Sequence, residues 1–286
     1  MPRTITAGVD GSPGSLAAAD WAAQEAGRRD VPLRVVHAAR QSAEEDSALT
    51  EAVARIARRH PDLSVDSDRV AAEPVSALLT AAEDAELVVL GSPGAGGVGG
   101  LLGGSVALAV VARSRRPVVL VPGGHRPDHD RPDHDRPGAP GATATPDVVV
   151  GLELTDPHDV VLEFAFDAAN RRAAGLRVVH GRREPDADDR GCDAGAVPGA
   201  EMTAVTGGHI LPDVLRPWQE KFPGVEVAEQ AVIGTAGTHL AEASGDAALV
   251  VVGHAGRRTP LGAAVGPVTQ ALLQQGSAPV AVVPHG

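Results

Sequence analysis

Residues 87–105 read "LVVLGSPGAGGVGGLLGGS", an apolar run that passes directly into a glycine-rich loop. Within the loop, Gly94, Gly96 and Gly99 satisfy the G-x-G-x-x-G spacing of dinucleotide-binding loops. That motif must follow the first strand, open directly into a helix, and precede an acidic residue about 20 positions later. Here the loop follows the fourth apolar run. About 20 residues after the loop, where an acidic residue is required, the chain has another apolar run instead. The sequence therefore excludes a Rossmann-type loop, and also a Walker A loop, because its only lysine is Lys221.

The same strand and loop return later in the chain. "DAELVVLG" at 84–91 is matched by "DAALVVVG" at 246–253, and "PVVLVP" at 117–122 by "PVAVVP" at 279–284, both at an offset of 162. "LRVVH" at 33–37 recurs at 176–180, an offset of 143, so the second copy carries 19 additional residues (162 minus 143). We place them in the polar, glycine-rich stretch from about 182 to 209. The chain is thus a tandem duplication.

The duplication predicts two domains, 1–122 and 147–286, joined by a linker at 123–146. The linker contains "RPDHD" twice and is rich in proline, glycine and charge. Such a segment cannot bury enough apolar surface to offset the entropy lost on ordering, so we expect it to be disordered. Its histidines, His125, His129 and His134, are expected to be solvated rather than metal ligands.

Short Val- and Leu-rich runs alternate with Ala-rich helical stretches in each half. In the first half, strands are predicted at 4–9, 33–37, 64–70, 87–90 and 117–121, and helices at 15–29, 43–59, 74–82 and 105–113. Near-continuous apolar strands are typical of a parallel sheet covered on both faces. The predicted fold class is therefore α/β, with two tandem doubly wound domains, each a five-stranded parallel sheet flanked by helices.

Composition narrows the function. The net charge of -12 argues against nucleic-acid or anionic-membrane partners, which require a basic face. Cys192 is the only cysteine, which excludes an intrachain disulfide and a cysteine metal cluster. No apolar run is long enough for a signal peptide or a transmembrane helix, so a cytoplasmic protein is expected.

A different spacing fits the loop. Gly91, Gly94, Gly104 and Ser105 follow the pattern G-2x-G-9x-G-S/T, and "VDGSPGS" at 9–15, "WAAQEA", "LRVVHA" and "RPVVLVP" accompany it in order. Together these motifs resemble the ATP-binding universal stress proteins, across both halves. The resemblance implies a sheet order of 3-2-1-4-5, ATP (or ADP or AMP) as ligand, with Mg²⁺ on its phosphates, and a role in regulating the stress response.

The residue types independently support a phosphate site. Gly91 and Gly94 let the main chain approach a ligand closely, because no Cβ intervenes. Gly104, Ser105 and Val106 stand at the start of a predicted helix, where free N–H groups attract an anion. We therefore expect this loop to bind the phosphates.

Two further positions complete the predicted site. In the order 3-2-1-4-5, the first and fourth strands are neighbours, which brings Asp10 beside the glycine loop. The resemblance implies that Asp10 binds the ribose and that the main chain at Ala38 meets the adenine. The alternative is that Asp10 is only a turn residue or helix cap.

The second half departs from this pattern. Gly253, Gly256 and Gly266 keep the spacing, but Pro267 replaces the serine and Glu153 replaces the aspartate. Proline has neither a hydroxyl nor an N–H, so two phosphate donors are lost. We expect a weaker adenine-nucleotide site here, or a purely structural role.

Three functions compete at this point. The first is an adenine-nucleotide-binding stress regulator that is not an enzyme, since no catalytic motif is visible, although slow ATP hydrolysis is compatible with it. The second is a nucleotide-independent interaction protein whose fifth strands, "PVVLVP" and "PVAVVP", form a homodimer or an intrachain pseudo-dimer. The third, a flavodoxin-type redox domain, is disfavoured because aromatic residues are only 2% of the chain.

Overall fold

The computed structural model describes residues 4–38, 46–92, 105–125, 145–154, 156–182, 202–233, 236–256, 258–259, 262–263 and 265–286, and the structural statements below concern these residues. In the first half the strands are β1 (Thr4–Gly8), β2 (Leu33–Ala38), β3 (Val65–Val70), β4 (Ala85–Ser92) and β5 (Val118–Pro122). The helices are α1 (Pro13–Arg29), α2 (Asp46–Arg59), α3 (Pro74–Glu83) and α4 (Ser105–Val111).

The second half repeats this alternation. Its main strands are β6 (Val148–Leu152), β7 (Leu176–Arg182), β8 (Val227–Ile233), β9 (Leu249–Ala255) and β12 (Val280–His285). Its helices are α5 (Asp159–Arg172), α6 (Met202–Lys221), α7 (Ala236–Ala243) and α8 (Pro267–Gln275). Two short strands, β10 (Arg258–Thr259) and β11 (Gly262–Ala263), form a separate antiparallel pair between β9 and α8.

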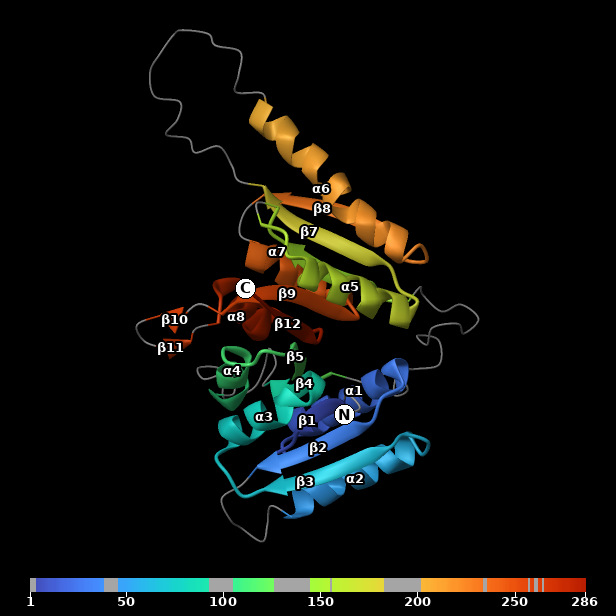
Figure 1. Ribbon diagram of the computed structural model, residues 1–286, viewed down its shortest axis with the longest axis vertical. Helices are drawn as coiled ribbons and strands as arrows, with labels where there is room; N and C mark the ends of the chain where they lie inside the picture. The colour runs from blue at the N-terminus through green and yellow to red at the C-terminus, as the bar shows by residue number, and fades with distance from the viewer. Residues whose placement is uncertain are drawn as a thin grey trace.

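The main strands of the described residues form one ten-stranded sheet that runs through both halves (Figure 1). Its order is β3-β2-β1-β4-β5-β12-β9-β6-β7-β8. Each half contributes five parallel strands in the order 3-2-1-4-5. The predicted fold class is confirmed.

The fifth strands of the two halves meet at the centre of this sheet. β5 and β12 pair antiparallel, with Val280 opposite Leu120 and Val282 opposite Val118. The other edge of β5 pairs with β4, and the other edge of β12 pairs with β9. Of the two arrangements expected for these strands, the structure has the intrachain pseudo-dimer, and neither strand keeps a free edge for a second chain.

Helices cover both faces of the sheet. α1, α2, α5 and α6 pack on one face, and α3, α4, α7 and α8 on the other. Alternate residues of β4 serve the two layers: Leu87 and Val89 pack towards α1, while Val88 and Leu90 pack towards α3. This double burial explains why the strands read as continuous apolar runs.

Beside the central strands, α1 and α5 cross-link the halves in a nearly symmetric way. The guanidinium of Arg29 lies 5.6 Å from the ring centre of Phe164, and that of Arg172 lies 5.6 Å from the ring centre of Trp21. Both pairs are related by the offset of 143 residues (164 minus 21, and 172 minus 29). Glu25 breaks the symmetry, because its buried carboxylate accepts hydrogen bonds from both Arg29 (2.7 Å) and Arg172 (2.6 Å).

Some predicted segments fall outside the described residues. These include 126–144 of the expected linker and 183–201 of the expected insertion, whereas 202–209 of that insertion belong to α6. The domain boundaries and the disorder of the linker stay predictions. None of the described helices is both long and apolar enough to cross a membrane.

Candidate functional site

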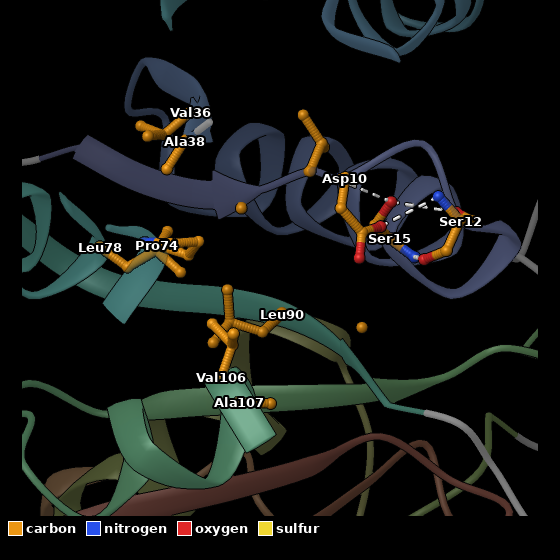
Figure 2. Close-up of a pocket in the computed structure, with 13 residues that line it drawn as sticks. Asp10, Ser12, Ser15, Val36, Ala38, Pro74, Leu78, Leu90, Val106 and Ala107 are labelled. Carbon is orange, nitrogen blue, oxygen red and sulfur yellow. Dashed lines mark hydrogen bonds between the residues drawn. The ribbon is translucent and has the colours of Figure 1, made fainter. Parts of the chain in front are cut away.

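A cavity of about 350 Å³ opens at the carboxyl ends of β1 and β4, where the winding of the first-half sheet reverses (Figure 2). This is the position at which open α/β sheets bind ligands. The residues that line it come from β1, β2, β4, α1, α3, α4 and the loops beside them: Gly8, Val9, Asp10, Ser12, Ser15, Val36, Ala38, Pro74, Leu78, Leu90, Gly91, Val106 and Ala107.

One end of the cavity is a polar turn between β1 and α1. Ser12 caps α1 by accepting a hydrogen bond from the Ser15 N–H at its Oγ (3.2 Å), and Pro13 occupies the first helical position. Ser15 Oγ accepts a hydrogen bond from the Asp10 N–H (3.2 Å) and donates one to the Ser12 carbonyl (3.0 Å). Gly11 has φ of 83°, a conformation that favours glycine. These bonds fix the turn on which Asp10 stands.

Asp10 carries a negative charge into this turn. Its Oδ1 accepts a hydrogen bond from the Ser12 N–H (2.9 Å). Partial burial alone raises the pKa of Asp10, but hydrogen bonds from Ser12 and Ser15 outweigh burial and leave the pKa below its ordinary value. At neutral pH the side chain is therefore a carboxylate, and its residue is exposed to solvent.

Gly91 is required where β4 passes α1. A Cβ at this position would lie 2.5 Å from the carbonyl carbon of Gly14 and 2.7 Å from the nitrogen of Ser15. Because these are main-chain atoms, they cannot rotate away as a side chain could. The Gly123 N–H donates to the Ser92 carbonyl (3.0 Å) and closes the same contact from the β5 side. Three glycines thus let β4, β5 and α1 approach at the mouth of the cavity.

The opposite end of the cavity is apolar. In Figure 2, Val36, Ala38, Pro74 and Leu78 lie together on one side, away from Asp10, Ser12 and Ser15. Leu90 and the first-turn residues of α4 complete the wall. The cavity therefore suits a ligand with a flat apolar part and a polar part.

The structure brings together four of the residues predicted for the first-half site: Asp10, Ala38, Gly91 and Val106 line this one cavity. Ser105 begins α4. Gly94 and Gly104 lie outside the described residues, so their part in the phosphate site stays a prediction.

Ser12, Ser15 and the α3 residues of the wall were missed in the sequence. The two serines had a usable signal, since "DGSPGS" places a cap residue directly before proline and a second serine three residues later. Pro74 and Leu78 gave no signal, because they read as ordinary residues of an apolar helix.

The second half is built differently at the equivalent place. Gly253 corresponds to Gly91, since it pairs with Val283 of β12 as Gly91 pairs with Val121 of β5. A Cβ on Gly253 would lie 2.8 Å from His285 Nε2 rather than against main chain. The His285 ring stacks on His158, with 3.5 Å between ring centres. Imidazoles fill the space that main chain fills in the first half.

The start of the helix differs as well. α5 begins at Asp159, which corresponds to Leu16 (159 minus 143), so it starts about one turn later than α1. His158 is its N-cap residue and makes no side-chain cap hydrogen bond. Burial and the charges of His158 and His254 lower the pKa of His285, against the opposing influence of nearby carboxylates.

The other residues predicted for the second-half site are spread around this end of the sheet. Glu153 lies exposed in the loop after β6, Gly256 follows β9, and Gly266 is the N-cap residue of α8. Nothing in their described surroundings gathers them as the first-half residues are gathered. Within the described parts of the chain, no group of three or more His, Cys, Asp or Glu side chains could hold a metal ion.

Comparison with known proteins agrees with this architecture. The family model described as "Universal stress protein family" matches residues 1–122 and 146–284. A universal stress protein of Mycobacterium tuberculosis strain H37Rv is 31% identical over 301 residues, covering 97% of this chain and 96% of that protein. A second one from the same strain is 29% identical over 302 residues, with 97% and 95% coverage. The crystal structure of a universal stress protein from Archaeoglobus fulgidus shares the fold, with a TM-score of 0.65, 17% identity, and coverage of 99% and 98%.

Proposed function

Because the chain belongs to the universal stress protein family, we propose that its first half binds an adenine nucleotide and that the protein acts as a nucleotide-dependent regulator of the stress response. The observation that carries this proposal is the cavity at the carboxyl ends of β1 and β4, which has a carboxylate at one end and an apolar wall at the other.

The polar end suits a ribose. A carboxylate has two oxygens and about four lone-pair sites, so Asp10 can accept ribose hydroxyls beside the bond from Ser12. Hydrogen bonds to a charged acceptor are the stronger ones. Asp10 would hold the ribose in this way, and the capped turn would hold Asp10.

The apolar wall suits the adenine ring. Val36, Leu78 and Leu90 offer flat packing surface, and the end of β2 at Ala38 offers main-chain groups beside it. Main-chain N–H and C=O groups can read the edge of a base by hydrogen bonds. The volume, about 350 Å³, falls at the lower end of ordinary small-ligand pockets, which favours an enclosed nucleoside with its phosphates directed outwards.

The phosphates would extend past Gly91 towards the start of α4. Gly91 lines the cavity there, where its lack of a Cβ lets β4 pack closely against the main chain of Gly14 and Ser15, and Val106 brings the first turn of α4 to the cavity. ATP would use more of this region than AMP, through the loop that contains Gly94 and Gly104. Mg²⁺, if it accompanies ATP, would be held mainly by the phosphates and water, because Asp10 is the only carboxylate among the described lining residues.

The proposal is of a binding protein. A scaffold that recruits partners through its fifth strands has no strand edge to offer, because β5 and β12 are paired on both sides within the described sheet. ATP hydrolysis is tested directly by measuring phosphate release in the samples used for binding.

The test is nucleotide-dependent thermal unfolding of the full chain, with AMP, ADP and ATP compared against inorganic phosphate and GTP. A ligand present at a hundred times its Kd adds about 2.7 kcal/mol to the free energy of unfolding. The melting temperature should then rise by about 5 °C with an adenine nucleotide. No shift with any of the three, together with no nucleotide released from freshly purified protein in mass spectrometry, would overturn the proposal.

Asp10→Asn sharpens this test. The substitution keeps the size of the side chain but removes its charge, so adenine-nucleotide affinity should fall by about tenfold or more, as expected for hydrogen bonds to a charged group. The matched control is Glu153→Gln at the equivalent position of the second half, which should leave affinity unchanged. Equal losses in both variants, measured by isothermal titration, would place binding elsewhere.

A further inference from the structure

The cavity of the first half borders the carboxyl ends of β1 and β2, and the pairing of these two strands stops there. β1 pairs with β2 as far as Gly8 and Val36, whereas β2 continues along β3 to Ala38. Ala38 lines the cavity, at the end that lies away from Asp10 in Figure 2. The place where the two strands part is therefore part of the site.

The second half keeps its strands paired for one more position. β6 pairs with β7 as far as Leu152 and His180. These residues correspond to Val9 and His37 of the first half (152 minus 143, and 180 minus 143). The duplicated strands thus differ by one pair, and the half with the shorter pairing is the one whose strand ends line the cavity.

A side chain takes the place of that pair in the first half. His37 Nδ1 lies 2.7 Å from the carbonyl oxygen of Val9. A carbonyl oxygen can only accept, so the imidazole carries a hydrogen on Nδ1 and donates it. His37 is 4% exposed, so this bond is sheltered from water.

This bond decides what the next main-chain amide can do. In the parallel ladder of β1 and β2, each β1 N–H donates to the residue before its partner, as Ile5 does to the Pro32 carbonyl (3.0 Å). Each β1 carbonyl accepts, in turn, from the residue after its partner. By this pattern the Val9 carbonyl would accept from the Ala38 N–H. The ring of His37 bonds that carbonyl instead, and Ala38 stays outside the β1–β2 pairing.

The same bond also fixes the position of Asp10. The Val9 carbonyl and the Asp10 N–H belong to one planar peptide unit. His37 donates to the carbonyl of this unit, and its N–H donates to Ser15 Oγ (3.2 Å). Because the unit is bonded on both sides, it cannot turn freely, and the Asp10 carboxylate keeps its place beside the cavity.

We propose that His37 is a positioning residue of the first-half site, which replaces the last main-chain bond between β1 and β2 and so keeps the Ala38 amide available to a nucleotide base. This inference rests on the proposed function, in which the main chain at Ala38 meets the adenine. Without the ring, the Val9 carbonyl takes the Ala38 N–H, as the longer pairing of the second half predicts. The base then loses that partner.

The test uses the full chain and two amides at one position. The side-chain nitrogen of asparagine is as many bonds from Cβ as Nδ1 of histidine, and that of glutamine as many as Nε2. His37→Asn should therefore keep the bond to Val9 and bind AMP almost as the wild type does. His37→Gln moves the donor away and should weaken AMP binding by about three- to tenfold in isothermal titration, the effect of losing one hydrogen bond. His180→Gln makes the same change in the second half and should leave the affinity unchanged.

A second measurement follows the Ala38 amide itself and needs no variant. Its counterpart is Gly181 (38 plus 143), which follows the last paired residue of β7 on the β6 side. In the free wild type, the Ala38 N–H should exchange with solvent faster than the Gly181 N–H, and AMP should slow it. In His37→Gln the Ala38 N–H should exchange slowly without AMP. Protection of Ala38 equal to that of Gly181 in the free wild type would overturn the proposal.

The outcomes separate the positioning role from the proposed function. If the wild type binds AMP and His37→Gln binds it equally well, the positioning role is wrong and the proposed function stands. If His37→Asn binds as weakly as His37→Gln, or His180→Gln loses as much affinity, the Nδ1 donor is not the cause and the role is again wrong. If the wild type binds no adenine nucleotide, the proposed function fails and this role fails with it.

Discussion

The two halves of the chain differ in the residues that pack at the carboxyl ends of their strands. In the first half, Gly91 lies against the main chain of Gly14, and a capped turn presents Asp10 to a cavity. In the second half, Gly253 lies against the imidazole of His285, which stacks on His158. The strand order, the parallel pairing and the layers of helices are the same in both.

The difference shows how little of the fold depends on the site. The strand residues that pack between the helical layers are Val, Leu and Ala in both halves, together with Ile5 of β1. The residues that distinguish the two strand ends, such as Asp10 and His285, lie at or just after the carboxyl ends of the strands and are not among the residues of that core. A duplicated domain can therefore change the residues at the ends of its strands and keep its fold, because a site resides in residues that the core does not use.

Glu25 tests the asymmetry with the largest expected effect. Its counterpart in the second half is Ala168 (25 plus 143), so Glu25→Ala copies one half into the other. The side chain of Glu25 is 1% exposed and that of Arg172 is 5% exposed, so the substitution leaves a buried guanidinium without this carboxylate. We expect a loss of about 3–5 kcal/mol in the free energy of urea unfolding. Asp213→Ala, which removes an exposed pair with Arg216, should cost almost nothing.

The same carboxylate predicts an acid dependence. Burial raises the pKa of Glu25, but the charges of Arg172 and Arg29 outweigh burial and hold the pKa below its ordinary value of 4.5. A carboxyl group with a lowered pKa contributes stability above its unfolded value and loses that stability as the pH falls through its folded value. Wild-type stability should therefore fall below pH 4.5 more steeply than that of Glu25→Ala. Parallel curves would contradict the ionic bridge between the halves.

Gly91→Ala and Gly253→Ala compare the two kinds of packing directly. The new methyl group meets main-chain atoms at 2.5 Å in the first half, but a side-chain ring at 2.8 Å in the second. A ring can rotate away and main chain cannot, so we expect about 3 kcal/mol for Gly91→Ala and about 1 kcal/mol for Gly253→Ala. Each half contains one of the two tryptophans, Trp21 in α1 and Trp218 in α6, so fluorescence can assign the loss. Gly124→Ala, with no atom near its Cβ, is the control.

The stacked histidines give the smallest expected effect. The lowered pKa of His285 means that the unfolded chain binds a proton more readily than the folded one. Stability contributed by the neutral ring is present above pH 6.5 and falls as the pH drops below it. His158 and His254 oppose protonation, while Asp156 and Glu153 favour it. Because the site is partly exposed, we expect less than about 1 kcal/mol between pH 7.5 and 5.5.

His285→Gly, which copies Gly123 of the first half, should remove this dependence. Urea unfolding followed through Trp218 at the two pH values measures it. If the unfolding transition reported by Trp21 shifts with pH and the transition reported by Trp218 does not, the assignment to the second half is wrong.

Much of the fold could be predicted because each strand is marked by a local apolar run, and because the same runs occur in both halves. The repeats located the strands of both halves, and the resemblance gave their order. The ends of elements were less exact where a cap or a partner strand decides them. The helix predicted from residue 15 begins at Pro13 because Ser12 caps it, and β4 runs on to Ser92 because Gly91 and Ser92 still pair with β5.

Apart from the pairing of the fifth strands, the contacts between the halves could not be predicted. Glu25 and Arg172 are 147 residues apart, and nothing near either residue indicates the other. The stacking of His158 on His285 depends on a helix that starts one turn late and on a strand that ends beside it. The cavity itself was predicted only at its polar and glycine positions, because its apolar wall has the same composition as the core.

The junction of β5 and β12 has a consequence for how the protein responds to dilution. In an assembly of two separate chains, such a strand pair dissociates when the protein concentration falls below the Kd of the dimer. Here the two strands belong to one chain. The covalent connection between them holds them at an effective concentration on the order of mM. The pairing of the two halves through β5 and β12 should therefore persist at any expression level.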